Sequence, residues 1–184
     1  MRVISGEYRG KKLYTLEGTN TRPTLDRVKE SLFNIIQNRI VDANVLDLFA
    51  GSGSLGIETL SRGARHAVFC DNSFEAIGVI KKNIEATKYL EKSTIINKDY
   101  IIALKQISQL NKKFDIVFLD PPYKSDFGSK AIDELIRLDL IAEDGIIILE
   151  TDDENIKKEI EEKKIKIFDE RKYGSVKLIF IRKE

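Results

Sequence analysis

The sequence predicts an α/β protein whose β-sheet is mostly parallel and covered by helices on both faces. From residue 44 onward, short apolar segments alternate with amphipathic segments of helical length, which is the pattern of repeated strand–helix units. The apolar segments are continuous rather than alternating, as in strands buried on both faces. With 184 residues the chain is long enough for a full hydrophobic core. We expect an N-terminal extension over residues 1–40 and one open-sheet domain over residues 41–184.

The N-terminal extension is expected to contain a hairpin and a helix. The segment Val3–Leu16 alternates weakly around Gly6 and Gly10, which favours a hairpin. Thr24 is a suitable N-cap for the helix that follows. The apolar face of that helix comprises Val28, Leu32, Ile35 and Ile36. Residues 2–12 carry four basic residues against one acid, Glu7, so we expect a basic arm: Arg2, Arg9, Lys11 and Lys12.

The remaining chain divides into alternating strands and helices. The expected strands are a run from Asn44 to a glycine-rich turn, Ala67–Asp71, Ser93–Asn97, Phe114–Leu119 and Gly145–Glu150. The expected helices are one starting near Leu55, then Ser73–Lys88, Tyr100–Leu110, Ser129–Leu138 and Asp153–Glu162. A closing pair turns at Gly174-Ser175 and consists of Ile165–Tyr173 and Val176–Ile181. The prediction is therefore a seven-stranded sheet with an antiparallel C-terminal strand.

Four of the predicted parallel strands end in, or are followed closely by, an acidic residue. These residues are Asp47, Asp71, Asp99 and Asp120. Right-handed crossovers bring the carboxyl ends of parallel strands to one edge of the sheet, where open α/β sheets bind ligands. Because four carboxylates at one edge repel one another and add nothing to a core, they indicate a binding site.

The most informative of these strand ends is Asp120-Pro121-Pro122-Tyr123. Both prolines fix φ and lack an N–H, so the chain must leave the sheet there in a rigid turn. The turn presents the Asp120 carboxylate, two backbone carbonyls and the Tyr123 ring. Acceptors beside a stacking ring suit a flat base with an exocyclic amino group. The alternative is an ordinary strand-to-loop exit.

A second signal is the glycine pattern G-x-G-x-x-G at Gly51, Gly53 and Gly56, which follows a short strand and opens a helix. Asp71 lies 20 residues after Gly51, where an acid can accept both hydroxyls of a ribose. These features alone also describe a dinucleotide site. Asp47 argues against that reading, because a carboxylate inside the preceding strand is unfavourable near a pyrophosphate and suits a cationic amino-acid group.

Composition excludes several classes of protein. Hydrophobic residues make up 42% of the chain and charged residues 33%, which describes a soluble globular protein. No apolar run is long enough to cross a membrane, and the first residues do not form a signal peptide. The only cysteine, Cys70, excludes a disulfide framework and a metal cluster and favours a reducing cytoplasm, and the only histidine, His66, is expected in a surface loop rather than as a catalyst.

Several of these motifs together resemble a known family. D-x-F-x-G-x-G from Asp47 to Gly53, the acid after the second strand, D-P-P-Y, and Tyr173-Gly174 resemble S-adenosyl-L-methionine-dependent amino methyltransferases. The segments Gly6-Glu7-Tyr8-Arg9-Gly10-Lys11-Lys12-Leu13 and Thr21-Arg22-Pro23-Thr24 narrow this to the bacterial 16S ribosomal RNA guanine-N2 methyltransferases of the RsmD type. This resemblance implies the Rossmann-like class I methyltransferase fold. One departure is Asp71, where the family usually has Glu.

The resemblance also implies roles for individual residues. The cofactor S-adenosyl-L-methionine, with product S-adenosyl-L-homocysteine, would be held by Asp47, Phe49, Gly51, Gly53, Asp71, Asn72, Asp99, Tyr100 and Asp120. The catalytic turn would be Asp120, Pro121, Pro122 and Tyr123. Nucleic acid would be contacted by Arg9, Lys11, Lys12, Arg22, Tyr123 and Tyr173. Asp99 is equally suited to be the N-cap of the next helix, and the two roles can coexist.

The partner implied by the resemblance is 16S ribosomal RNA. Because 31 basic residues face 30 acidic ones, the chain lacks the strong positive charge of enzymes that act on free RNA. We therefore expect a monomer that meets its RNA within the assembled or assembling small ribosomal subunit. Alternatives are a DNA or other RNA amino methyltransferase, a protein glutamine methyltransferase, an NAD-binding oxidoreductase, and a non-catalytic nucleotide-binding module.

Overall fold

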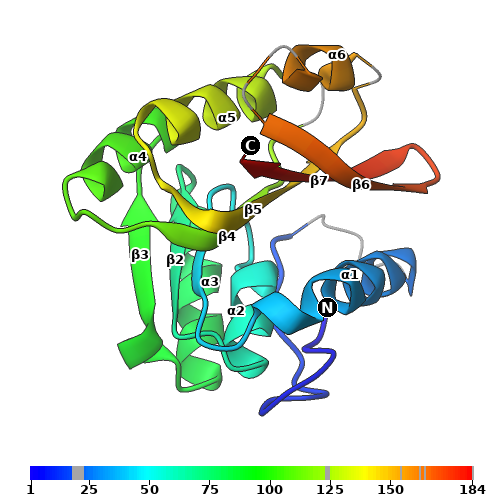
Figure 1. Cartoon of the computed structure of the whole chain (residues 1–184). Coiled ribbons are helices and arrows are strands. Elements are labelled where there is room, and N and C mark those ends of the chain that lie inside the picture. The colour runs from blue at the N-terminus through cyan, green and yellow to red at the C-terminus, as the bar shows by residue number, and fades with distance from the viewer. Residues whose placement is uncertain (18–22, 123–124, 154, 162, 164, 184) are drawn as a thin grey trace.

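The computed structural model describes the chain except residues 18–22, 123–124, 154, 162, 164 and 184 (Figure 1). Two of the expected site residues, Arg22 and Tyr123, lie outside the described residues.

The centre of the fold is a seven-stranded sheet in the order β3-β2-β1-β4-β5-β7-β6. Its strands are β1 (Asn44–Asp47), β2 (His66–Asp71), β3 (Ser93–Asn97), β4 (Phe114–Leu119), β5 (Ile141–Thr151), β6 (Ile165–Tyr173) and β7 (Val176–Lys183). β1 to β5 are parallel to one another, and β7 is antiparallel to both β5 and β6. The strand order reverses between β1 and β4, as it does in doubly wound folds. The predicted class I methyltransferase architecture is confirmed.

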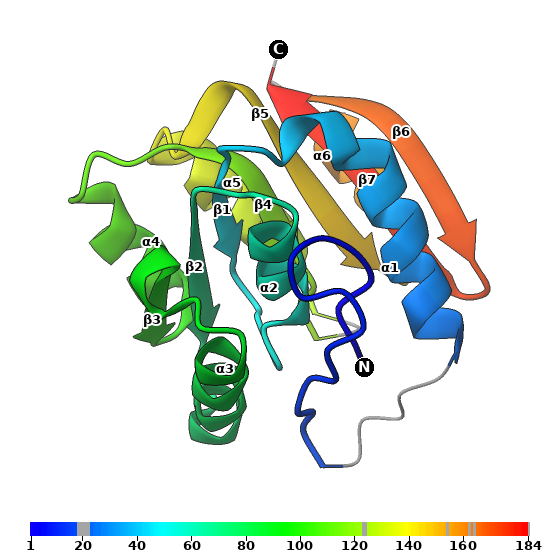
Figure 2. The same ribbon diagram turned by 90° about the horizontal axis from the view of Figure 1, so that it is seen from below.

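Helices cover both faces of this sheet (Figures 1 and 2). α1 (Pro23–Ile36), α2 (Ser54–Ser61) and α3 (Phe74–Ala86) bury their apolar residues in one core cluster. α4 (Tyr100–Ser108), α5 (Phe127–Arg137) and α6 (Ile156–Glu161) bury theirs in a second cluster on the other face. Two short 3₁₀ turns, Gln37–Arg39 and Leu90–Lys92, precede β1 and β3.

Some predicted boundaries are wrong for local reasons. β5 begins at Ile141 rather than Gly145, because a register shift against β4 between Phe114 and Ile116 lets the strand continue through the polar residues before Gly145. α5 begins at Phe127, two residues before the predicted start. α6 is shorter than predicted, since the Asp153 carboxylate accepts the Asn155 N–H at 2.8 Å in the turn before the helix.

The N-terminal arm (residues 1–17) curls beside α2 and α3 (Figure 2). Its predicted hairpin is reduced to a single antiparallel bridge between Arg2 and Lys12. Contacts with the body replace the missing ladder, and Val3 and Leu13 are buried in the core cluster of the α1–α3 face. Thr24 lies inside α1, which includes Pro23, so the predicted N-cap position is wrong.

Candidate active site

A cavity of about 680 Å³ opens at the carboxyl edge of the sheet, where the strand order reverses. This volume lies within the range of roughly 300–1,000 Å³ that is usual for small-molecule and cofactor sites. The cavity is lined by acidic residues (Asp71, Asp99, Asp120 and Glu150), by aromatic residues (Phe49, Tyr100 and Phe127), by the prolines of the D-P-P turn, and by residues of the arm and α1 (Met1, Leu16, Val28, Lys29 and Leu32).

The glycine-rich loop after β1 forms the floor of this cavity. Gly51 and Gly53 both have positive φ, +55° and +75°, and Gly53 directly precedes α2. A Cβ atom on Gly56 would lie 2.3 Å from the Phe69 ring, so glycine there allows α2 to pack closely on β2. Only Gly51 of these three contributes to the cavity wall.

Asp47 lies beneath this loop and does not reach the cavity wall. Its side chain is 2% exposed, and its Oδ2 accepts the Gly56 N–H at 3.1 Å. Burial raises the pKa of Asp47 to about 7, and the nearby Asp71 carboxylate raises it further, while the Gly56 N–H and the Lys29 ammonium oppose the shift. The structure therefore places Asp47 in a supporting position, behind the residues that a ligand would touch.

Asp71 and Asp99, both expected to bind the cofactor, line one end of the cavity. The Asp71 carboxylate accepts the Gly51 N–H and the Ser73 N–H, each at 2.9 Å, which fixes it between the two loops. Asp99 accepts the Ile101 N–H at 3.0 Å as the N-cap of α4 and also lines the cavity, so both of its expected positions coexist. Asn72 lines the same end.

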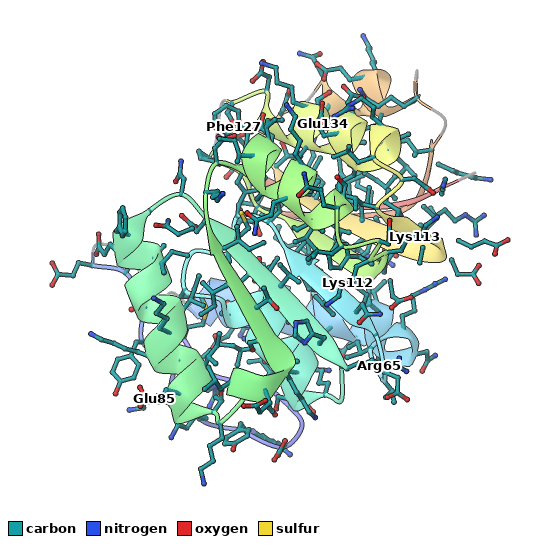
Figure 3. All side chains as sticks on the ribbon, turned by 90° about the vertical axis from the view of Figure 1, so that its left-hand side faces the viewer. Arg65, Glu85, Lys112, Lys113, Phe127 and Glu134 are labelled. Atoms are coloured by element: carbon teal, nitrogen blue, oxygen red, sulfur yellow. The ribbon has the colours of Figure 1, made fainter. Side chains whose placement is uncertain are left out.

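Three aromatic rings form one wall of the cavity. The Tyr100 ring lies 5.2 Å from the ring of Phe49 and 5.2 Å from the ring of Phe127, measured between centroids. Phe49 and Phe127 are nearly parallel, with 13° between their planes and 6.5 Å between their centroids. Phe127, at the start of α5 (Figure 3), was not expected from the sequence. Such a wall suits a flat ring such as adenine.

Asp120 and Pro121 directly follow β4 and line the cavity. The Asp120 side chain keeps an open surface toward the cavity, while protein atoms crowd its other sides. This confinement raises the pKa of Asp120 above its ordinary value, and the carboxylates of Glu150 and Asp47 add to the increase. Glu150, near the end of β5, was also missed from the sequence.

Residues of α1 and of the arm also line the cavity. Lys29 of α1 is 5% exposed and pairs with the fully buried Glu58 of α2 at 3.1 Å. Glu58 also accepts the Ile4 N–H at 2.8 Å and the Ser5 N–H at 2.9 Å. One buried carboxylate thus joins the arm, α1 and α2.

The basic residues expected to contact RNA lie on the outer surface of the arm. Arg9, Lys11 and Lys12 are exposed, and Lys11 and Lys12 border a groove of about 330 Å³ with Tyr14, whose side chain is 57% exposed. Tyr173 is placed differently, since its hydroxyl hydrogen-bonds with the Ser31 hydroxyl on α1.

Other candidate groups do not form a second site. Cys70 is buried, which raises the pKa of its thiol to about 12, and His66 shares a hydrogen bond of 2.8 Å with Thr94. Within the described part of the chain, no group of His, Cys, Asp and Glu side chains is arranged to hold a metal. The described helices include none that is long and apolar enough to cross a membrane.

Comparison with known proteins agrees with this geometry. The family model described as conserved hypothetical protein 95 matches residues 1–182. Ribosomal RNA small subunit methyltransferase D of Haemophilus influenzae is 40% identical over 153 residues, which cover 83% of this chain and 79% of that protein. The chain belongs to the RsmD family.

Solved structures agree with this membership. The structure of yhhF, a candidate methyltransferase of Escherichia coli, is 32% identical, has a TM-score of 0.86, and covers 100% of this chain and 98% of its own. The fold is also shared by SMU.776, a candidate methyltransferase complexed with SAH, with a TM-score of 0.65 at 20% identity over 81% of this chain and 48% of that one. This RsmD-family protein is thus a methyltransferase in fold and in family.

Proposed function

We propose that this protein transfers a methyl group from S-adenosyl-L-methionine to the exocyclic N2 of a guanine in 16S ribosomal RNA of the small subunit. The observation that carries the proposal is a single cavity with two different ends. One end has Asp71, Asp99 and an aromatic wall, and the other has the Asp120-Pro121-Pro122 turn. Membership of the RsmD family, with relatives named for small-subunit RNA, supports the choice of substrate.

The first end fits the proposed cofactor. Asp71 is held by two backbone N–H groups and would accept hydrogen bonds from the ribose hydroxyls with its remaining lone pairs. Asp99 would accept a hydrogen bond from the adenine amino group, with the adenine ring against Phe49 and Phe127. The cationic end of the cofactor would lie over the loop that contains Gly51, where the Asp47 carboxylate lies beneath the floor. S-adenosyl-L-methionine, when bound, supplies the methyl group as part of a reactive sulfonium.

The D-P-P turn would act on the amine that receives the methyl group. The guanine 2-amino lone pair is delocalised into the ring, so it is a poor nucleophile. The Asp120 carboxylate and a backbone carbonyl of the turn would accept its two N–H protons and direct the lone pair toward the methyl group. Alignment of the reacting atoms can account for about 7–11 kcal/mol of the barrier. No strong base is required, because the alkylated amine loses a proton readily.

The basic arm would bind RNA outside the cavity. Arg9, Lys11 and Lys12 are exposed for phosphate contacts, and the exposed Tyr14 ring beside Lys11 and Lys12 offers a surface for base stacking. With a formal net charge of +1, the whole chain attracts RNA only weakly. We therefore propose the assembled or assembling small subunit as substrate, met by a monomer in the cytoplasm.

The test is to map modified guanines in 16S RNA from cells with and without this chain. The purified protein is then given S-adenosyl-L-methionine with small subunits lacking the modification, and separately with protein-free 16S RNA. We expect one N2-methylguanine to depend on the chain and faster transfer to subunits than to free RNA. Identical maps in the two strains would contradict the proposed function. Equal transfer to both substrates would contradict only the assembled-subunit part.

A further inference from the structure

The D-P-P turn does not by itself explain why guanine would be chosen. Adenine, cytosine and guanine all carry an exocyclic amino group, and a carboxylate beside two carbonyls can accept protons from any of them. The ring position next to that group differs. Guanine has an N1–H donor there, whereas adenine and cytosine have a bare nitrogen acceptor. A residue that selects guanine must therefore accept a hydrogen bond beside Asp120.

Glu150 is the carboxylate that lies beside Asp120 in the cavity. Leu119, the last residue of β4, pairs with Leu149 of β5, so Asp120, directly after β4, takes the next position beside Glu150 of β5. Side chains at matching positions of parallel strands point to the same face of the sheet. Both residues line the same cavity, and the Glu150 carboxylate is close enough to raise the pKa of Asp120.

The sheet order places Glu150 on the side of Asp120 that faces away from the cofactor end. Asp71 and Asp99 follow β2 and β3, on one side of β4, whereas β5 lies on the other side. Apolar residues of α1, Val28 and Leu32, also line the cavity. A flat base inserted there would lie against an apolar surface with its hydrogen-bonding edge toward the two carboxylates.

We propose that Glu150 is a specificity residue that accepts the N1–H of the target guanine while Asp120 accepts a proton of its 2-amino group. This assignment rests on the proposed function and deepens it. Two neighbouring carboxylates match the two neighbouring donors of guanine. The same pair repels the ring-nitrogen lone pair that adenine or cytosine would present, so Glu150 rejects those bases as well as binding the correct one.

The assignment is tested with 2-aminopurine in place of the mapped target guanine, in RNA assembled into small subunits. 2-Aminopurine keeps the 2-amino group but has an acceptor at N1. The parent protein should methylate it about 10- to 150-fold less efficiently than guanine, the effect expected for loss of one hydrogen bond to a charged group. Equal efficiency on the two bases would overturn the role of Glu150.

The variant Glu150→Gln then tests the direction of the hydrogen bond. Its amide can donate to the N1 of 2-aminopurine, so we expect kcat/KM for guanine to decrease and that for 2-aminopurine to increase above the parent value. Binding of S-adenosyl-L-methionine, measured by calorimetry, should stay within about two-fold. Glu143→Gln, the same change at an exposed position near the other end of β5, should leave both rates unchanged.

The outcomes separate this inference from the function on which it rests. If the parent protein methylates guanine and Glu150→Gln lowers transfer to both bases alike, Glu150 has a structural role and the inference is overturned. If the parent protein does not methylate the mapped guanine at all, the proposed function fails first and the inference fails with it.

Discussion

Asp71 and Asp120 line the same cavity but differ in what holds them. Both oxygens of Asp71 accept backbone N–H groups, so the side chain is fixed before any ligand arrives. Burial raises the pKa of Asp120, and the neighbouring carboxylates add to the increase. A fixed acceptor suits binding of a cofactor. The charged form of Asp120 is unfavourable by itself, and a donor such as an amine stabilises it by a hydrogen bond. The two residues should therefore fail in different ways when they are replaced.

Asp71→Asn should weaken S-adenosyl-L-methionine binding about ten-fold or more, because one charged acceptor of the ribose is lost. Asp120→Ala should leave that binding within about two-fold and reduce the rate of transfer by orders of magnitude, since its contact forms mainly in the transition state. Calorimetry and single-turnover transfer to small subunits measure the two effects. If Asp120→Ala transferred methyl at the parent rate, the D-P-P turn would have no catalytic role and would be an ordinary end of β4.

The buried Asp47 carboxyl should make the stability of the folded protein depend on pH. Burial raises its pKa in the folded protein to about 7, above the ordinary value of 3.8 that applies in the unfolded chain. Between these values the folded state binds more protons than the unfolded state, so the stabilising contribution is present below pH 4 and is lost as the pH rises toward 7.

Asp47→Asn should therefore flatten the decrease in unfolding free energy between about pH 4 and pH 7. That decrease amounts to about 1.4 kcal/mol for every pH unit that separates the folded and unfolded pKa values. The amide oxygen of Asn can still accept the Gly56 N–H, so the loop should keep its shape. Urea unfolding of the ligand-free protein at several pH values measures the slope. Asp42→Asn, at an exposed position before β1, is the control. An unchanged slope in Asp47→Asn would contradict the burial of a titrating group.

At the scale of elements, the N-terminal arm is held by tertiary contacts rather than by its own pairing. Ser61 of α2 accepts the Glu7 N–H through its carbonyl at 2.8 Å and donates its hydroxyl to the Ser5 carbonyl at 2.7 Å. On α3, the buried Asn83 exchanges hydrogen bonds with the Tyr14 backbone at 2.7 and 3.0 Å and also reaches the Ser52 carbonyl. The arm is therefore positioned by α2 and α3, and Asn83 connects it to the glycine-rich loop of the cavity.

Gly6 and Gly10 offer a matched test of this docking. Both have positive φ, +85° and +83°, but a Cβ on Gly6 would lie 1.8 Å from the Ser61 carbonyl oxygen, whereas a Cβ on Gly10 meets nothing within 4 Å. Gly10→Ala should cost about 1–2 kcal/mol of stability through strain alone. Gly6→Ala should cost about 1–3 kcal/mol more, because the arm must shift away from α2. Equal losses in urea unfolding would show that the arm is not docked against Ser61.

The elements also show how far the sequence could predict this molecule. The strands, the glycine loop and three cavity-lining acids, Asp71, Asp99 and Asp120, carry local signals, because an apolar run followed by an acid occurs within a few residues. Glu150 ends a strand in the same way, but Asp152 and Asp153 follow it, which makes it resemble part of a solvated acidic loop.

Other features depend on contacts between distant parts of the chain, so local patterns cannot predict them. Lys29 reaches the cavity wall because its charge is matched by Glu58, 29 residues later. The burial of Asp47 beneath the loop, the position of Phe127 against Phe49 and Tyr100, and the reduction of the hairpin to one bridge likewise follow from packing. The sequence indicates which residue types occur at strand ends, whereas the structure decides which of them face the cavity.

At the scale of the whole molecule, the distribution of charge matters more than its sum. The net charge of +1 gives little long-range attraction to RNA, so binding depends on where the basic residues lie. Arg9, Lys11 and Lys12 are exposed on the arm. Arg65 and Lys112 precede β2 and β4 at the amino edge of the sheet, away from the cavity (both labelled in Figure 3). Binding through the arm therefore predicts unequal effects of the two basic groups.

Replacing Arg9, Lys11 and Lys12 together by Gln should weaken binding to small subunits and reduce its salt dependence. Each phosphate contact that is lost should reduce the magnitude of the slope of log K against log salt by about 0.7–0.9. Loss of all three contacts should therefore reduce the magnitude of this slope by roughly two to three. The control replaces Arg65, Lys105 and Lys112, also exposed, by Gln, which removes the same charge elsewhere. S-adenosyl-L-methionine binding should be unchanged in both variants, because none of the six residues lines the cavity. If the two triple variants lose equal affinity and slope, binding follows net charge alone, and the arm has only a packing role.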